Sequence, residues 1–138
     1  MRKFLLLLSI LTIGLSSCAE DDSPAPTGIV DNWLLTEVLF DPGDGSGTFQ
    51  PADRVLVLVF DADGTVQATD GICSLINSGS DANTTGTYDE TLGEIFISDC
   101  SDNTGEFTLS YEQEGNTLDV HPPCIEGCTL RFERIVED

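Results

Sequence analysis

The chain has few basic residues. Five Lys and Arg and one His stand against 25 Asp and Glu in 138 residues, which gives a net charge of −20. So acidic a surface repels nucleic-acid phosphates and anionic lipid head groups, so we expect no nucleic-acid partner. No lysine follows Lys3, so the chain lacks a Gly-rich phosphate loop with its lysine. The remaining options are divalent cations, basic partners or a solvated acidic coat.

The chain also lacks an apolar run long enough to span a bilayer. Its longest run, residues 4–15, falls short of the roughly 20 apolar residues that a spanning helix needs. The run follows Arg2 and Lys3 and has the length typical of a secretory signal, so residues 1–17 are predicted to be a signal peptide. Its removal takes away two basic residues and no acidic one, which changes the net charge from −20 to −22.

The predicted signal ends in Leu15-Ser16-Ser17-Cys18, which resembles the lipobox of bacterial lipoproteins. The resemblance implies cleavage before Cys18, attachment of diacylglycerol to its sulfur and acylation of the new amino group. Several acyl chains anchor a protein durably, since each buried CH₂ contributes about 0.8 kcal/mol. We therefore expect membrane attachment through Cys18; an ordinary signal with a chance cysteine, or a core helix, is the alternative.

Residues 18–28 are predicted to be a flexible acidic and Pro-rich linker that holds a domain off the membrane. Ala19 stands where an Asp would resemble an inner-membrane retention signal, which favours the outer membrane. Glu20-Asp21-Asp22 resembles the acidic export signal of Bacteroidetes-type lipoproteins, which implies exposure at the cell surface. A solvated acidic linker is the alternative reading of these three residues.

Four cysteines remain once Cys18 is set aside, and an even number in an exported chain predicts two disulfides. Three connectivities are open, of which we favour Cys73–Cys100 with Cys124–Cys128. Gly127 lets the backbone turn tightly inside the short second loop. A four-thiolate zinc site is the rival, but paired C-x-x-C spacing is absent.

Residues 29–138 are predicted to form one all-β domain. Alternating or apolar runs bounded by turn residues indicate eight strands, and no stretch has convincing helical periodicity. The predicted strands are residues 30–40, 54–60, 65–69, 85–89, 94–98, 107–113, 117–121 and 129–136. Residues 71–84 are expected to be irregular. Short links favour an antiparallel eight-stranded up-and-down barrel, with a sandwich or partly open barrel as the alternative.

At this point residues 28–136 resemble the lipocalin-like lipoproteins of Bacteroidetes-type bacteria. The likeness lies in Asn32-Trp33-Leu34-Leu35, in the Gly-rich stretch 41–49 and in Pro123-Cys124-Ile125-Glu126-Gly127-Cys128. It implies a barrel with one closed end and a mouth for a small apolar ligand. It also implies that an arginine of the last strand packs on Trp33; Arg134 is the first candidate and Arg131 the second.

The sequence contains no catalytic motif, so we expect a protein that is not an enzyme and has no cofactor. The single histidine, His121, precedes two prolines, and no Gly-x-Ser-x-Gly motif accompanies it. A carboxylate pair for glycoside hydrolysis stays open among so many acids. Asp41 and Asp61 begin acidic loops that miss the EF-hand spacing, so they are read as turns and no metal site is predicted; a weak Ca²⁺ site is the alternative.

The leading hypothesis is an outer-membrane lipoprotein whose barrel binds a small apolar ligand or an envelope protein partner. A structural or accessory subunit of an envelope complex, without a ligand pocket, is the alternative, and an enzyme is third. The residues expected to line a pocket are Leu35, Val57, Phe96, Leu109 and Phe132.

Overall fold

The fold is described from a computed structural model, which covers residues 28–69, 71–77, 83–97 and 107–136. The predicted signal peptide, Cys18 and nearly all of the linker lie outside these residues. The elements are β1 (Asn32–Phe40), β2 (Gln50–Pro51), β3 (Val57–Phe60), β4 (Thr65–Thr69), α1 (Ile72–Asn77), β5 (Thr84–Asp89), β6 (Glu94–Ile97), β7 (Phe107–Glu114), β8 (Thr117–His121) and β9 (Cys128–Arg134). Within this part of the chain, no helix is long and apolar enough to cross a membrane.

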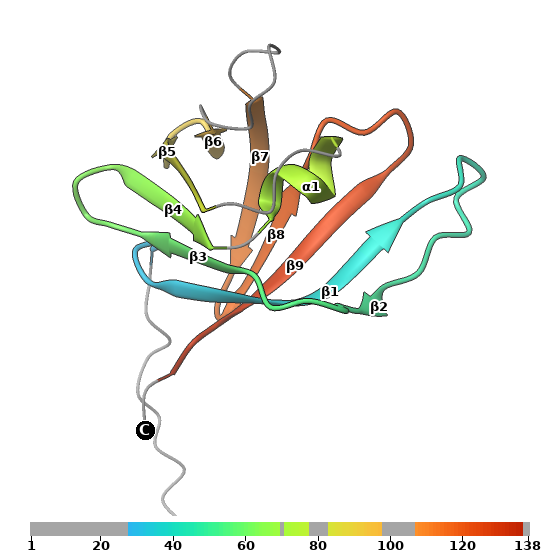
Figure 1. Cartoon of the computed structure of the whole chain (residues 1–138), viewed down its shortest axis with the longest axis horizontal. Helices are drawn as coiled ribbons and strands as arrows, with labels where there is room; N and C mark the ends of the chain where they lie inside the picture. Colours follow the sequence, from blue (N-terminus) through green and yellow to red (C-terminus); the bar gives the residue numbers. More distant parts are fainter. Residues whose placement is uncertain (1–27, 70, 78–82, 98–106, 137–138) are drawn as a thin grey trace, which may run out of the picture.

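The strands form one antiparallel sheet that closes on itself (Figure 1). Its order follows the chain from β3 to β9, and β9 then pairs with β1, which in turn pairs with β3. The closing β1–β9 pair runs from Trp33 opposite Arg134 to Phe40 opposite Cys128, with one irregularity between Leu35 and Glu37. Closure pairs each of the eight barrel strands on both sides, and the predicted eight-stranded barrel is confirmed.

Two elements were not predicted. β2 is a two-residue strand that pairs with the far half of β1, beyond the point where β3 leaves it. α1 falls in the segment that was expected to be irregular, so that expectation is wrong for Ile72–Asn77.

The two ends of the barrel differ because an up-and-down chain alternates its connections. We call the "turn end" the end that holds the tight connections 61–64, 90–93 and 115–116, together with Gly28 and Ile135. The opposite "loop end" holds α1 and the longer connections 41–49 and 122–127. At the loop end, β1 and the 41–49 connection project sideways from the barrel (Figure 1).

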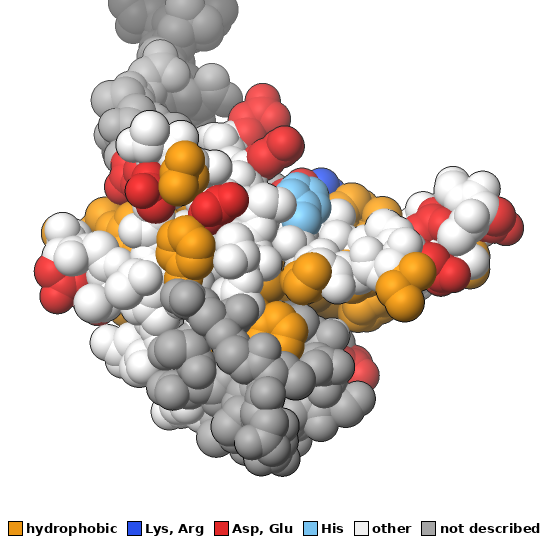
Figure 2. Space-filling model, turned by 90° about the horizontal axis from the view of Figure 1, so that it is seen from above, with side chains coloured by type: hydrophobic (Ala, Val, Ile, Leu, Met, Phe, Trp, Pro, Cys, Tyr) orange, Lys and Arg blue, Asp and Glu red, His pale blue; other side chains and the backbone are white. Residues whose placement is uncertain are grey.

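The core is the inside of the barrel. Because side chains alternate between the two faces of a strand, every second one points into it, and most of these are apolar. Seventeen buried apolar residues form one cluster, including Trp33, Phe60 and Phe132. On the outside the chain shows its acidity. Seen from above, Asp and Glu gather at the edges and on the projecting part, whereas Lys or Arg surfaces in one small area beside the histidine (Figure 2).

Candidate functional site

The barrel interior is occupied by the protein's own side chains. Three of the five residues expected to line a pocket point inward, and Leu35, Leu109 and Phe132 are at most 3% exposed. Val57 and Phe96 are partly exposed and alternate with buried neighbours, so they lie on the outside of the sheet. The prediction that they share the interior with the other three is therefore wrong.

The turn end is closed by Trp33 and Arg134. The guanidinium carbon of Arg134 lies 4.3 Å from the Trp33 ring centroid, which is the contact that the family resemblance implies. The Trp33 indole N–H donates to the Ile29 carbonyl at 2.8 Å, and Ile29 is itself buried. Arg134 also donates to the Gly28 carbonyl at 2.8 Å, which ties the start of the domain across this end.

Asp31 completes this closure as the ion partner of Arg134. Its Oδ2 accepts a hydrogen bond from Arg134 Nη1 at 2.7 Å, and the arginine side chain is only 3% exposed. Burial alone would raise the pKa of the Asp31 carboxyl. The hydrogen bonds from Arg134 and the Asn32 N–H, with the charge of Arg134, outweigh burial and hold that pKa below its ordinary value. The pair is structural because it satisfies a buried cation.

The loop end is covered by α1. Ile72 and Cys73, in the first turn of the helix, belong to the core cluster and are at most 1% exposed. Arg54 holds the helix from the barrel side, because its Nη1 donates to the Ser74 hydroxyl at 2.7 Å. Cys73 is disulfide-bonded. The predicted partner, Cys100, lies outside the described residues, so the Cys73–Cys100 pairing stays a prediction.

An apolar ligand would therefore have to displace core side chains. Both hollows described below lie on the outer surface of the sheet instead. The barrel interior is filled by buried side chains, and Trp33 with Arg134 closes one end while α1 covers the other. This barrel therefore differs from barrels that enclose a ligand cavity.

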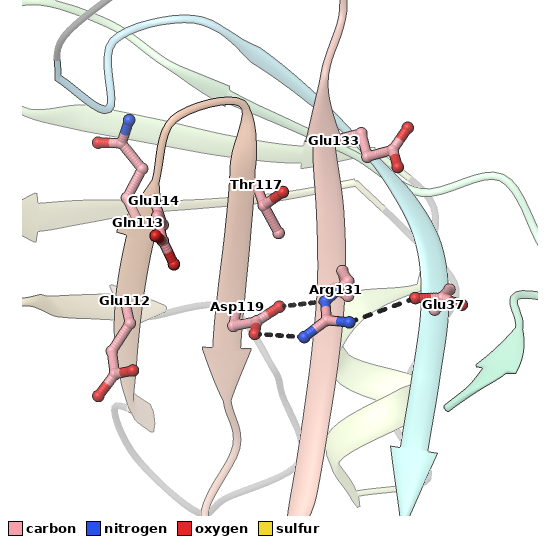
Figure 3. Close-up of a pocket in the computed structure, with 8 residues that line it drawn as sticks. All are labelled: Glu37, Glu112, Gln113, Glu114, Thr117, Asp119, Arg131 and Glu133. Atoms are coloured by element: carbon pink, nitrogen blue, oxygen red, sulfur yellow. Dashed lines mark hydrogen bonds and ion pairs between the residues drawn. The ribbon is translucent and has the colours of Figure 1, made fainter. Parts of the chain in front are cut away.

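The first outer hollow is an acidic groove of about 710 Å³ over β1, β7, β8 and β9 (Figure 3). We define the acidic groove by the residues that line it, which are Glu37, Glu112, Gln113, Glu114, Thr117, Asp119, Arg131 and Glu133. Five of these eight are carboxylates and one is a cation. The groove thus concentrates part of the chain's negative charge in one place.

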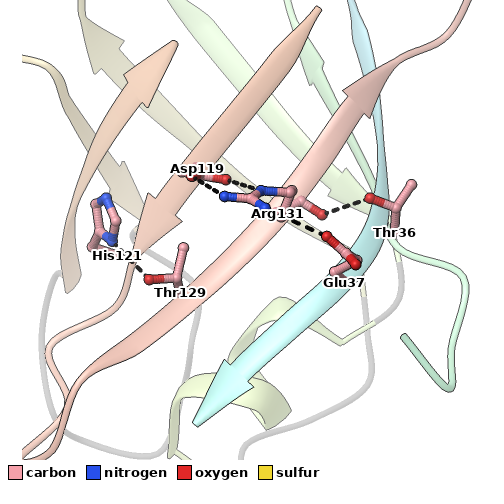
Figure 4. Close-up of polar contacts among 6 residues, drawn as sticks. All are labelled: Thr36, Glu37, Asp119, His121, Thr129 and Arg131. Carbon is pink, nitrogen blue, oxygen red and sulfur yellow. Dashed lines mark hydrogen bonds and ion pairs between the residues drawn. The ribbon is translucent and has the colours of Figure 1, made fainter. Parts of the chain in front are cut away.

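Arg131 is the only cation of the acidic groove, and its charge is already paired. It grips Asp119 with two hydrogen bonds of 2.8 Å and reaches Glu37 at 3.5 Å (Figures 3 and 4). The Phe49 ring covers it, with the guanidinium carbon 3.7 Å from the ring centroid. The hydrogen bond to Asp119, followed by the neighbouring negative charges, raises the pKa of Arg131 above its ordinary value. Arg131 therefore fastens the 41–49 connection to the barrel.

The second outer hollow is a neutral groove of about 520 Å³ over β4, β5 and β6. Its lining consists of Thr65, Val66, Gln67, Thr85, Gly86, Thr87 and Phe96. Val66 and Gly86 face each other across the β4–β5 pair, so their backbone forms the floor. Gly86 is required here, because a Cβ at this position would collide with the Phe96 carbonyl oxygen of the next strand.

His121 does not join a catalytic constellation among the described residues. Its Nδ1 lies 3.2 Å from the Thr129 hydroxyl, a contact between β8 and β9 (Figure 4). A triad would also need an orienting carboxylate on the ring and a nucleophile beside it. The contact instead joins two neighbouring strands on the outside of the barrel.

The acidic loops are turns. Both Asp41 carboxylate oxygens accept backbone N–H groups, from Gly43 at 2.7 Å, Gly45 at 3.0 Å and Gly47 at 2.8 Å. These bonds, that of Gly47 first, hold the pKa of Asp41 below its ordinary value. Asp63 accepts from Thr65 in the same manner. In the part of the chain that the structure describes, no group of three His, Cys, Asp or Glu is placed to hold a metal ion.

The predicted disulfide between Cys124 and Cys128 is present. It closes the loop between β8 and β9, and Ile125 at its tip is fully exposed. The Asp41 N–H donates to the Gly127 carbonyl at 2.8 Å, so this loop leans against the connection after β1. Phe40, half exposed, pairs with Cys128 beside it.

The two grooves were not predicted from the sequence. Their residues come from three or four strands that meet only in the closed sheet, so no local motif marks them. Comparison with known proteins found no match among family models, curated proteins or solved structures. The likeness to lipocalin-like lipoproteins accordingly remains a prediction from the sequence.

Proposed function

We propose that this protein is a lipid-anchored accessory protein of the bacterial outer membrane, without enzymatic activity, that binds an envelope partner through the outer surface of its barrel. The observation that carries the proposal is the filled interior. Residues that would line a ligand cavity, such as Leu109 and Phe132, are fully buried in the core. What remains for recognition is the outside of the sheet and the loop end.

The position of Gly28, where the described part of the chain begins, supports an orientation with the loop end away from the membrane. Gly28 lies at the turn end, held by Arg134. A lipid on Cys18 would be joined to that end by the linker 18–28, which spans at most about 30 Å as an extended Pro-rich segment. The loop end, with α1 and the Cys124–Cys128 loop, would then face away from the membrane. The longer connections therefore become the part that a partner reaches first.

The acidic coat is consistent with residence close to a membrane without lying on it. The processed chain, with a net charge of −22 after loss of Arg2 and Lys3, would be repelled by anionic lipid head groups, so only the anchor would hold it there. The alternative ligand, a small apolar molecule in the interior, would require the loss of packed core contacts. No observation favours it.

Acyl labelling tests the anchor. Cells that express the chain are fed an alkyne-tagged fatty acid, and the protein is then captured and probed for the tag. The wild type is expected to carry the tag and to run as the processed form, whereas Cys18→Ser is expected to remain untagged and unprocessed. Cys124→Ser serves as the matched control because it makes the same Cys-to-Ser change at a disulfide cysteine, and it is expected to stay tagged.

Protease treatment of intact cells tests the exposure. Degradation of the protein without lysis is the expected result. Equal labelling of Cys18→Ser and the wild type, or a soluble wild-type protein, would contradict the anchor. Protection on intact cells would contradict only the outward orientation.

A further inference from the structure

The outer surface of the barrel holds a hollow whose lining carries no charge, the neutral groove. Strands β3 to β7 present fourteen outward-facing residues. Asp89, Glu94, Glu112 and Glu114 are acidic, and ten are uncharged. The uncharged residues are Val57, Val59, Thr65, Gln67, Thr69, Thr85, Thr87, Phe96, Thr108 and Ser110. The opposite side of the barrel holds the acidic groove.

The neutral groove is lined by uncharged residues, and the acidic pair Asp89 and Glu94 follows at its turn-end side. Four of its seven lining residues carry a hydroxyl or an amide, and Phe96 adds an aromatic ring. Its volume of about 520 Å³ falls in the range of ligand sites, about 300–1,000 Å³. It is therefore a hollow with polar groups, one aromatic face and no charge in its walls.

Three polar side chains that line the neutral groove have donors or acceptors that are not used within the described part of the chain. The Thr87 hydroxyl makes no hydrogen bond with the described part of the chain, so it is open as donor and acceptor. Thr65 donates to Asp63 at 2.6 Å and keeps its oxygen lone pairs. Gln67 makes one long bond, from Nε2 to Asp61 at 3.4 Å, which leaves its carbonyl oxygen free to accept.

The chemistry of these walls narrows the ligand class. A cation finds no carboxylate in them, and an anion is repelled by the whole chain. An extended peptide cannot add as a strand, because β4, β5 and β6 are each paired on both sides. A wholly apolar ligand would strip water from three hydroxyls and an amide without replacing their hydrogen bonds.

We propose that the neutral groove of β4, β5 and β6 binds an uncharged saccharide. A sugar ring stacks one C–H face on the Phe96 ring, and its hydroxyls exchange hydrogen bonds with Thr65, Gln67 and Thr87. Because the groove holds its ligand from one side only, the ligand is a segment of a longer neutral glycan that continues along the sheet. The inference rests on the proposed function in one respect, namely that binding takes place on the outer surface of the barrel.

The test is native gel electrophoresis of the full-length lipidated protein in gels that contain a dissolved polysaccharide. A polyoxyethylene detergent is used, since a sugar-headed detergent would compete. The probes are a neutral α-glucan, β-glucan, xylan and mannan, with polygalacturonate as the anionic counterpart. The strongly acidic chain migrates fast, so retardation is easily measured.

At least one neutral polysaccharide is expected to retard the wild type, and polygalacturonate is not. Phe96→Ala is expected to weaken binding about five- to tenfold through loss of the stacking surface. Thr87→Val, which keeps the shape and removes the hydroxyl, is expected to weaken it about threefold. Leu92→Ala and Ser110→Ala are matched controls outside the groove and are expected to bind as the wild type does.

Three results would overturn the inference. One is the absence of retardation by every neutral polysaccharide, and another is retardation that Phe96→Ala and Thr87→Val leave unchanged. The third is a dimer, seen by sedimentation of the same sample, that Phe96→Ala dissociates while saccharide binding is absent; a second copy of the chain would then cover the face. None of these results affects acyl labelling at Cys18, so the anchor proposal is judged separately.

Discussion

Replacing Phe132 with alanine tests whether the barrel interior is solid. Phe132 is fully buried in β9 and lies opposite Leu35 and Leu118, which are buried as well. Removing a fully packed phenylalanine costs about 3–5 kcal/mol of unfolding free energy, through lost transfer and the cavity left behind. A side chain that bordered an open ligand cavity would lack packing on one side, and its loss would cost closer to about 1–2 kcal/mol.

Phe96→Ala is the matched control, because it makes the same chemical change on the outer face of β6. Its expected cost is about 1 kcal/mol or less, as for other partly exposed positions. Urea unfolding under non-reducing conditions measures both variants. The single tryptophan, Trp33, is fully buried and reports unfolding by its fluorescence. If Phe132→Ala costs no more than Phe96→Ala, the interior is not packed as described.

Two further predictions concern the ends of the barrel. Because the folded pKa of Asp31 is lowered, its contribution to stability is complete above the unfolded pKa of about 3.9 and is lost as pH falls through the folded pKa. The stability difference between wild type and Asp31→Asn, measured by urea unfolding at several pH values, should therefore be largest at neutral pH and shrink in acid; a constant difference would contradict the ion pair with Arg134. Cys128→Ser should lower the unfolding free energy by about 2 kcal/mol, as expected for opening a five-residue loop, and an unchanged value would mean that the loop is ordered without its disulfide.

The strands could be predicted because alternation and turn residues are local signals. Both predicted ends of the strand Thr117–His121 match the structure, because its polar and apolar side chains alternate between a tight turn and two prolines. The ends of longer strands were less well placed: β3 begins at Val57 and not at residue 54. α1 was missed because six residues are too short to show helical periodicity, and its first turn has no acidic residue to signal it.

The face of each strand could not be predicted where both faces are apolar. In β3, Val57 and Leu58 look equivalent in the sequence, and only closure of the barrel places Leu58 inside. The same holds for Phe96 between Ile95 and Ile97. The neutral groove depends on this choice, since Phe96 contributes to it only by facing outward. Its other residues lie on β4 and β5. The pairing register of these strands with β6 brings them together, and this register cannot be read from the sequence.

Native mass spectrometry of the protein purified from outer membranes tests the central claim most directly. The account predicts a chain that begins at Cys18, carries covalent acyl groups and retains no small apolar molecule when the detergent is stripped in the gas phase. A chain that still begins at Met1 without acyl groups would contradict the anchor. A stoichiometric apolar ligand, released only when the barrel unfolds, would contradict the solid interior.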